Sequence, residues 1–358
     1  MNRLSYLIFL LPLLMGSCQT IAPYRMDILR PGYKATPIGK SGLLMVDNAG
    51  SQPADYGHIC KGFVSSNLDS AISLNYHTDT LAPLILTYLS GRLAKEGYYD
   101  TITVASKRWF RPAKTGSLDF LRTEPLNNEQ KNALRDSSRA PLWLSLDRLL
   151  VQTKTSNKPY SGYSLVTRDV VVRTVWRLID ARADTLCLAF QHNDTLFWDK
   201  AGEDTQMALD EMPDFSETLP EMADYVAERI APIVGPYWET VERFYYISGS
   251  YRLKDAVDYL NKNNWDTAAE IWKQEYAKGF ALGCGRFRAA MNLILYYERA
   301  GIPDLAMDWC NKAEMAYKKS ILKPSTYEIH VLMAWKKALQ GRVEEFKKLK
   351  IFYNGNLD

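Results

Sequence analysis

The sequence predicts an α+β protein with two domains: an N-terminal α/β sandwich built on a mixed sheet, and a C-terminal all-α domain. Three observations support this prediction. Strand and helix patterns alternate as far as residue 235, strand patterns are absent after Tyr251, and a chain of 358 residues exceeds the usual size of one hydrophobic core. We therefore place the α/β domain at residues 41–235 and the helical domain at residues 236–358.

The α/β domain contains both strand patterns and helix patterns. Residues 43–46 form a short, continuous apolar run, which is the pattern of a strand buried on both faces. Residues 81–95 repeat apolar side chains at helical spacing, and Gly97 is a suitable end for that helix. The same reasoning predicts a strand at residues 101–105, a polar helix at 127–135 and a closing helix at 216–230.

The middle of this domain is expected to be an extended meander. Residues 142–150 and 170–179 alternate between two faces, and the arginines of the second segment mark its wetter face. A polar loop containing Pro159 and Gly162 separates the two segments. A turn at residues 180–184 then joins the second segment to a further strand, which completes a hairpin.

Three short segments of this domain match a known topology. They are Val46-Asp47-Asn48, Ala140-Pro141-Leu142-Trp143-Leu144 and Val175-Trp176-Arg177-Leu178-Ile179-Asp180. They resemble the N-terminal α/β module of several envelope proteins, including curli-secretion-type lipoproteins and penicillin-binding-protein activators. The resemblance concerns topology, and it implies a protein of the cell envelope.

The start of the chain has the composition of an export signal. Arg3 precedes an apolar run at residues 4–15, which is too short to cross a hydrocarbon core of about 30 Å comfortably as a helix. Small residues follow, so we expect residues 1–17 to be a removable signal peptide. The segment Met15-Gly16-Ser17-Cys18 resembles the lipobox of bacterial lipoproteins. This resemblance implies cleavage before Cys18 and a diacylglyceryl group on its thiol.

Residues 18–40 are expected to be a tether between that lipid and the body of the protein. Pro23, Pro31 and Pro37 interrupt any periodicity there, so we expect irregular structure. Two or more acyl chains anchor a protein stably, whereas one chain binds only marginally. Gln19 after the cysteine resembles a sorting signal for the outer membrane, which implies a protein on its periplasmic side.

Composition excludes some classes of function. Lys and Arg number 44 and Asp and Glu number 41, and this balance does not favour a nucleic acid as partner. Histidines at ligand spacing and CxxC pairs are absent from the sequence, so we expect no metal site and no cofactor. Cysteines outside the signal could pair in an oxidising compartment, although apolar patterns around two of them favour small core residues. These cysteines are Cys60, Cys187, Cys284 and Cys310.

The C-terminal domain contains small and aromatic residues at regular spacing. They are Asn292-Leu293, Tyr297, Gly301, Ala306 and Lys312-Ala313. This set resembles the tetratricopeptide repeat, in which Gly301 would permit a tight turn and Ala306 would let the two helices approach closely. The resemblance implies a stack of helix pairs with a curved groove suited to a peptide or a protein.

Two further units flank this match. Upstream, Trp265, Ala268 and Trp272 repeat the pattern, with Asn263 in place of the turn glycine. Downstream, Gly341 falls at the turn position of a degraded unit, which we expect to cap the stack.

Two segments link the domains to one family. They are Ile230-Ala231-Pro232 and Trp238-Glu239-Thr240-Val241-Glu242-Arg243. Together with Cys18 and the repeat pattern, they resemble a family of uncharacterised Gram-negative envelope lipoproteins with C-terminal tetratricopeptide-like repeats. That family is a domain of unknown function, so the resemblance implies a location and a fold but no activity.

Two sets of residues are candidates for binding. The first lies on the predicted repeat pair, where its members either line the inner groove and accept an acidic peptide terminus or are simply solvated. These residues are Arg286, Arg288, Asn292 and Arg299. The second set is aromatic and follows the α/β domain, where it forms either a binding platform at the domain junction or an interdomain core. These residues are Trp238, Phe244, Tyr245 and Tyr246.

Catalytic motifs are absent from the sequence. GxSxG and HExxH do not occur, and the glycines of residues 32–41 are spaced wrongly for a phosphate loop. We therefore hypothesise that the chain is not an enzyme and acts as a lipid-anchored scaffold or adaptor for a protein partner. The alternative is an envelope lipoprotein that binds or processes glycan or peptidoglycan through the aromatic residues. A purely structural assembly subunit is a third option.

Overall fold

The computed structural model describes residues 20–33, 41–49, 52, 57–61, 72–73, 75–105, 127–278 and 284–353. The signal peptide and Cys18 lie outside these residues. The chain divides into two compact units, which we call the α/β unit and the helical unit. The α/β unit comprises Pro31–Tyr237 and Lys350–Asp358, and the helical unit comprises Met1–Arg30 and Trp238–Leu349. The prediction of a mixed α+β fold with a C-terminal helical region is confirmed.

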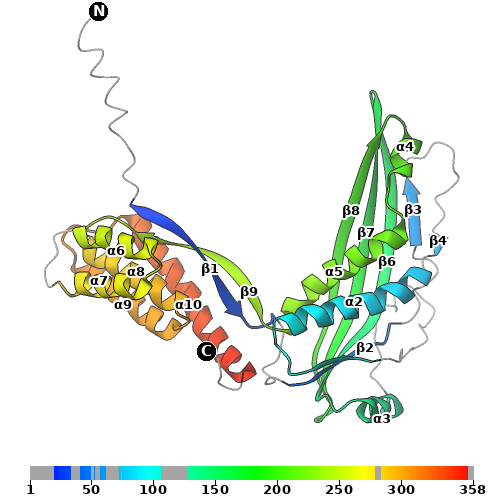
Figure 1. Ribbon diagram of the computed structural model, residues 1–358, viewed down its shortest axis with the longest axis horizontal. Coiled ribbons are helices and arrows are strands. Elements are labelled where there is room, and N and C mark those ends of the chain that lie inside the picture. Colours follow the sequence, from blue (N-terminus) through cyan, green and yellow to red (C-terminus); the bar gives the residue numbers. More distant parts are fainter. Residues whose placement is uncertain are drawn as a thin grey trace, which may run out of the picture. The chain divides into compact units, whose positions relative to one another are not determined.

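A mixed sheet forms the centre of the α/β unit (Figure 1). Its strands are β2 (Leu43–Asp47), β3 (Gly57–Lys61), β4 (Ile72–Ser73), β5 (Ile102–Val104), β6 (Leu142–Tyr160), β7 (Tyr163–Asp180) and β8 (Thr185–Gly202). The order along the sheet is β4-β3-β6-β2-β5, and β7 pairs with both β6 and β8. Strand β2 runs parallel to β5 and β6, whereas β7 runs antiparallel to both of its neighbours, β6 and β8.

The central strand is β6, which has a different partner on each edge. One edge pairs with β7 from Leu142 opposite Asp180 to Tyr160 opposite Tyr163. The other edge pairs in parallel with β2 near its start and with β3 near its end. The predicted loop around Pro159 is therefore wrong, because both strands continue to a tight turn in which Gly162 has a φ of 90°.

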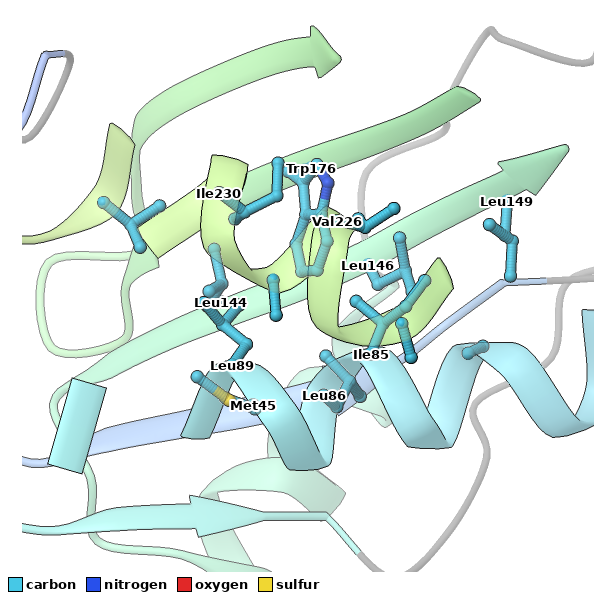
Figure 2. Close-up of a cluster of buried hydrophobic side chains, with 14 of the residues drawn as sticks. Met45, Ile85, Leu86, Leu89, Leu144, Leu146, Leu149, Trp176, Val226 and Ile230 are labelled. Carbon is cyan, nitrogen blue, oxygen red and sulfur yellow. The ribbon is translucent and has the colours of Figure 1, made fainter. Parts of the chain in front are cut away.

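Helices cover both faces of this sheet. The helices of the unit are α2 (Asn75–Lys95), α3 (Asn128–Ser137), α4 (Thr205–Asp210) and α5 (Phe215–Val234). On one face, α2 and α5 pack side by side over Met45, Leu144 and Trp176 (Figure 2). On the other face, Leu134 of α3 packs with Leu44. Every residue of β2 is buried, as predicted for a strand covered on both sides.

The helical unit contains five helices among the described residues. They are α6 (Tyr251–Asn261), α7 (Trp265–Ala277), α8 (Gly285–Arg299), α9 (Pro303–Lys319) and α10 (Thr326–Phe352), of which α10 ends in the α/β unit. Neighbouring helices pack in chain order from α6 to α9. The turn residues Asn263 and Gly301 have φ of 55° and 71°, which confirms the predicted turn positions. Gly341, in contrast, lies inside the continuous helix α10, so the expected third turn is wrong.

A two-stranded sheet completes the helical unit and has no counterpart in the sequence prediction. Strand β1 (Ile21–Arg30) pairs with β9 (Tyr237–Tyr246). The contacts of Arg25 with Glu242 and of Asp27 with Thr240 run in opposite order along the two strands, so the pair is antiparallel. Residues 21–30, which we expected to be an irregular tether, are thus part of the fold. Each strand of a two-stranded sheet has one unpaired edge, so β1 tolerates the missing N–H of Pro23.

Candidate functional site

Two of the predicted binding residues fasten the end of β9 to the helices. Asn292 is fully buried, and its side chain accepts a hydrogen bond from the Tyr246 amide (2.7 Å) and donates one to the Tyr246 carbonyl (2.9 Å). Arg288 donates to the Ser248 carbonyl (3.2 Å) and forms an ion pair with Glu328 (3.1 Å). Both side chains are therefore engaged inside the unit and do not line an open groove.

The other two predicted residues lie nearer the surface. Arg299 is exposed, with its guanidinium 4.7 Å from the centre of the Trp265 ring and its Nε donating to the Tyr24 hydroxyl (3.0 Å). Arg286 is half-buried and lies 4.6 Å from the centre of the Tyr276 ring. Stacking on aromatic rings fixes a guanidinium plane without consuming all of its donors. Arg299 therefore keeps exposed donors that a partner could use, whereas for Arg286 only the terminal nitrogens are candidates, because its Nε is buried without a hydrogen-bond partner.

The predicted aromatic platform lies on strand β9, and three of its four rings pack into the helical unit. Phe244 contacts Trp335 and Tyr246, with ring centres 6.0 and 5.5 Å apart. Tyr245 packs edge-on against Trp265, at 6.4 Å between centres. Trp238, in contrast, is 56% exposed. The alternative that these rings form a core receives support, but the core belongs to the helical unit.

A buried carboxylate joins three elements of the helical unit. Glu298 of α8 accepts two hydrogen bonds from Arg243 of β9, at 2.8 and 2.7 Å. It also accepts one from the indole N–H of Trp335 on α10, at 2.8 Å. The side chain of Glu298 is only 2% exposed. A carboxylate satisfied in this way fixes β9 against the helices, which is a structural role.

The α/β unit has its own buried charge cluster, where β2 ends beside β6. Arg177 of β7 forms an ion pair with Asp147, and both side chains are almost fully buried. Asp147 also accepts hydrogen bonds from the Ser145 hydroxyl (2.6 Å) and the Asn48 amide (3.3 Å). Sequence reasoning does not select this cluster, although alternation places Ser145 and Asp147 on one face.

Two titratable side chains of the helical unit, Tyr246 and Glu328, have shifted pKa values. Burial raises the pKa of the Tyr246 phenol above its ordinary range, so this ring remains neutral. For Glu328, burial favours the neutral acid, but hydrogen bonds from Ser325 and the charge of Arg288 outweigh it and lower the pKa of the carboxyl. Glu328 and Arg288 therefore form a charged pair at neutral pH.

Within the described ranges, the structure contains neither a candidate metal site nor a candidate membrane-spanning helix. Among these residues, no group of three or more His, Cys, Asp or Glu side chains could hold a metal ion. Nor is any helix within them long and apolar enough to cross a membrane. Cys187, Cys284 and Cys310 are free thiols, whereas the side chain of Cys60 lies outside the described part of the structure.

Two family models match the sequence. The first, described as Domain of unknown function (DUF8603), matches residues 42–246, which is more than half of the chain. The second, described as Domain of unknown function (DUF6340), matches residues 254–341 in the helical unit. No curated protein matches the chain.

Several solved structures have weak similarity to the chain. The PelC dodecamer from Paraburkholderia phytofirmans is 10% identical with a TM-score of 0.24, covering 59% of this chain and 99% of that one. The hypothetical protein CT253 from Chlamydia trachomatis is 11% identical with a TM-score of 0.20, covering 54% and 94%. Lipoprotein GNA1162 from Neisseria meningitidis is 13% identical with a TM-score of 0.18, covering 53% and 98%. Similarity this low does not indicate a shared function.

Proposed function

The chain belongs to the family described as Domain of unknown function (DUF8603), and from this premise we propose that it is a lipid-anchored envelope protein that holds a protein partner. In this proposal Cys18 carries the lipid, the protein faces the periplasm from the outer membrane, and the helical unit is the scaffold. The protein has no catalytic role of its own. Anchoring a scaffold in a membrane raises the local concentration of the partner that it binds.

The observation that carries the proposal is the construction of helices α6 to α9. Ala268 and Ala306 are fully buried at the positions where a tetratricopeptide-like repeat needs small residues. Asn263 and Gly301 have the positive φ that its tight turns need. We propose that the two helix pairs are tetratricopeptide-like repeats, an arrangement suited to binding an extended segment of another protein.

Arg286 and Arg299 are the residues that we propose for contact with the partner. Both arginines keep guanidinium donors beyond their aromatic contacts, and guanidinium groups bind carboxylates in a bidentate manner. A partner with an acidic segment fits this chemistry. The glycan alternative has less support, because Trp238 is the one ring of the predicted platform that is largely exposed.

The partner is tested by photocrosslinking in intact envelopes. A photoreactive phenylalanine derivative replaces Arg299, and a matched control replaces Arg182, an exposed arginine of the α/β unit. We expect a discrete product from the first position that is absent from the second. Arg286→Glu should reduce that product at least several-fold, since it reverses the proposed charge contact. Identical products from both positions would contradict the proposal.

The anchor is tested by mass spectrometry of the mature N-terminus. We expect a chain that begins at Cys18 and carries the added mass of a diacylglyceryl group. A mature chain that begins elsewhere, or an unmodified Cys18, would refute the anchor but leave the partner proposal to the crosslinking experiment.

A further inference from the structure

We infer that one end of the helical unit is a membrane-contacting surface, which lies on the bilayer that holds the Cys18 lipid. We call this end the proximal end and define it by residues 247–251, 284–285 and 318–328. The inference rests on the proposed anchor, and it identifies the surface of the protein that contacts the lipid headgroups. Four features support it: the length of the tether, the convergence of chain segments, the exposed side chains and the local charge.

The tether between Cys18 and the folded body is very short. The Ile247 amide donates a hydrogen bond to the Thr20 carbonyl (3.0 Å), so the fold begins at Thr20. An extended chain advances at most about 3.6 Å per residue, which limits the distance from Cys18 to Thr20 to about 7 Å. Strand β1 then continues into the helical unit. A lipid on Cys18 would therefore hold this end of the unit against the headgroups.

Contacts among the connecting segments define the proximal end. The chain passes from Ile247 through Ser248, whose carbonyl accepts a hydrogen bond from Arg288 in the first turn of α8. Arg288 also pairs with Glu328 in the first turn of α10. The thiol of Cys284 lies 3.7 Å from the Leu322 carbonyl, where it donates a weak hydrogen bond. These contacts bring the starts of α6, α8 and α10 close to the start of β1.

Large apolar and aromatic side chains are exposed at this end. Tyr251 is 80% exposed, Tyr327 69%, Leu322 61% and Ile321 60%. Soluble proteins rarely leave such groups together in water, and exposed groups of this kind mark interaction sites. Tyrosines with aliphatic neighbours are typical of protein segments at the membrane–water interface, where the ring lies among headgroups and the hydroxyl stays hydrated.

The charge at the proximal end complements an anionic lipid surface. Lys318, Lys319 and Lys323 are exposed around the apolar residues. The carboxylates of Glu275 and Glu328 are buried and ion-paired with Lys278 and Arg288, so they offset little of the positive charge. Basic residues beside interfacial aromatic side chains are typical of surfaces that bind acidic lipids. The occupant with the best match is thus a bilayer containing anionic phospholipid.

The inference is tested with a chain that cannot be lipidated at Cys18. Purified Cys18→Ser protein that lacks residues 1–17 is sedimented with vesicles of phosphatidylcholine, with or without phosphatidylglycerol. We expect binding to the anionic vesicles that weakens as salt is added. Lys318→Gln with Lys319→Gln should weaken it by about fivefold per lysine. Tyr251→Ser, Leu322→Ser and Tyr327→Ser together should weaken it by roughly tenfold or more, because their apolar area no longer enters the interface.

The matched control changes exposed apolar residues at the opposite end of α9. Ile302 and Leu305 are 42% and 40% exposed, and Ile302→Ser with Leu305→Ser should leave vesicle binding unchanged. Circular dichroism and thermal unfolding verify that each variant is folded. Equal loss of binding in the control and in the proximal-end variant would overturn the inference.

The remaining outcomes separate this inference from the anchor. If Cys18 is lipidated in envelopes but the Cys18→Ser chain ignores every vesicle, the membrane surface is refuted and the anchor stands. If the Cys18→Ser chain binds anionic vesicles but native Cys18 is unmodified, the surface is supported and the anchor alone fails. If the proximal-end variants change self-association in sedimentation analysis and not vesicle binding, the surface belongs to a second copy of the chain and the inference is wrong.

Discussion

The guanidinium of Arg177 on β7 donates to both carboxylate oxygens of Asp147 on β6, within a part of the sheet that solvent does not reach. The pairing of β6 with β7 shifts between Leu146 and Arg148, so Asp147 is the extra residue of a β-bulge. A bulge re-aims the side chain that it carries, which here meets Arg177. The buried pair therefore fixes the register of the two longest neighbouring strands.

Removal of Arg177 is expected to destabilise the α/β unit strongly. Arg177→Met should lower the free energy of unfolding by about 3–5 kcal/mol, because it leaves the Asp147 carboxylate buried without its counterion. Adding Asp147→Leu to this variant should recover part of the loss, since no buried charge then remains. Urea unfolding followed by circular dichroism measures both values.

Arg182→Met is the control for this prediction, because Arg182 is an exposed arginine just beyond the same strand. It should change the free energy of unfolding by no more than about 0.5 kcal/mol. If Arg177→Met proves as mild as Arg182→Met, the pair does not stabilise the sheet.

Local patterns could predict part of this arrangement. Alternation along residues 142–150 places Ser145 and Asp147 on one face, and it places Arg177 on one face of the next strand. The arginines also predict that this face is exposed to solvent, whereas Arg177 is buried in the structure. Whether a face is covered depends on tertiary packing, which a pattern of a few residues does not contain.

The ribbon of β1 and β9 shows a second limit of local patterns. Burial alternates along the first part of β9, but apolar and polar residues fall on both of its faces, so the sequence there shows no clear strand period. Its partner strand, moreover, lies over two hundred residues away along the chain, as the contact of Arg25 with Glu242 shows. Pairing over such a separation leaves no local signal, so the sequence predicts a tether where β1 lies. The turns at Asn263 and Gly301 are predictable because each is determined by its own residue.

Asn292 is expected to contribute stability through its two hydrogen bonds to Tyr246. Asn292→Ala should destabilise the helical unit by at least about 2 kcal/mol, because the amide and carbonyl of a buried residue lose their partner. Hydrogen exchange at the Tyr246 amide should accelerate in parallel. Asn264→Ala is the matched control, since Asn264 caps α7 through one bond to the Thr267 amide and should cost only about 1 kcal/mol. Equal costs for both variants would contradict the prediction.

Glu328 is expected to make stability depend on pH. Burial opposes its charge, but hydrogen bonds from Ser325 and the charge of Arg288 hold the folded-state pKa of this carboxyl below its ordinary value of 4.5. A depressed folded-state pKa contributes stability that is complete above the unfolded-state pKa and is lost as pH falls through the folded-state value. Glu328→Gln should therefore cost stability at neutral pH, and the difference from the wild type should shrink below pH 4.5.

Urea unfolding of the wild type and of Glu328→Gln, from neutral pH to below pH 4.5, measures this difference. Glu344→Gln serves as control, because Glu344 is an exposed carboxylate paired with Lys347 and should have little effect at either pH. A wild-type advantage over Glu328→Gln that stays constant down to low pH would show that the charge of Glu328 is not its source.

Two glycines of the helical unit are expected to respond oppositely to alanine. Gly341 lies inside α10, where an added methyl group would meet open space, so Gly341→Ala should stabilise the unit by about 0.5–1 kcal/mol. At Gly285 the added carbon would lie 2.8 Å from a carboxylate oxygen of Glu275, so Gly285→Ala should destabilise. Thermal unfolding measures both signs. A stabilising Gly285→Ala would mean that α7 and α8 do not approach as closely as the structure shows.

Cys310 is expected to be inert in the folded protein. Its side chain is fully buried on α9, and this burial raises the pKa of the thiol to about 12. Because the thiolate is the reactive form, iodoacetamide at mildly alkaline pH should leave Cys310 unmodified until urea unfolds the unit. Cys187, a half-buried thiol, provides an internal comparison that should react earlier. Mass spectrometry of the peptides gives both rates. If Cys310 reacts as fast as Cys187 in the native protein, α9 opens readily and the helical unit is not the rigid scaffold that the proposed function requires.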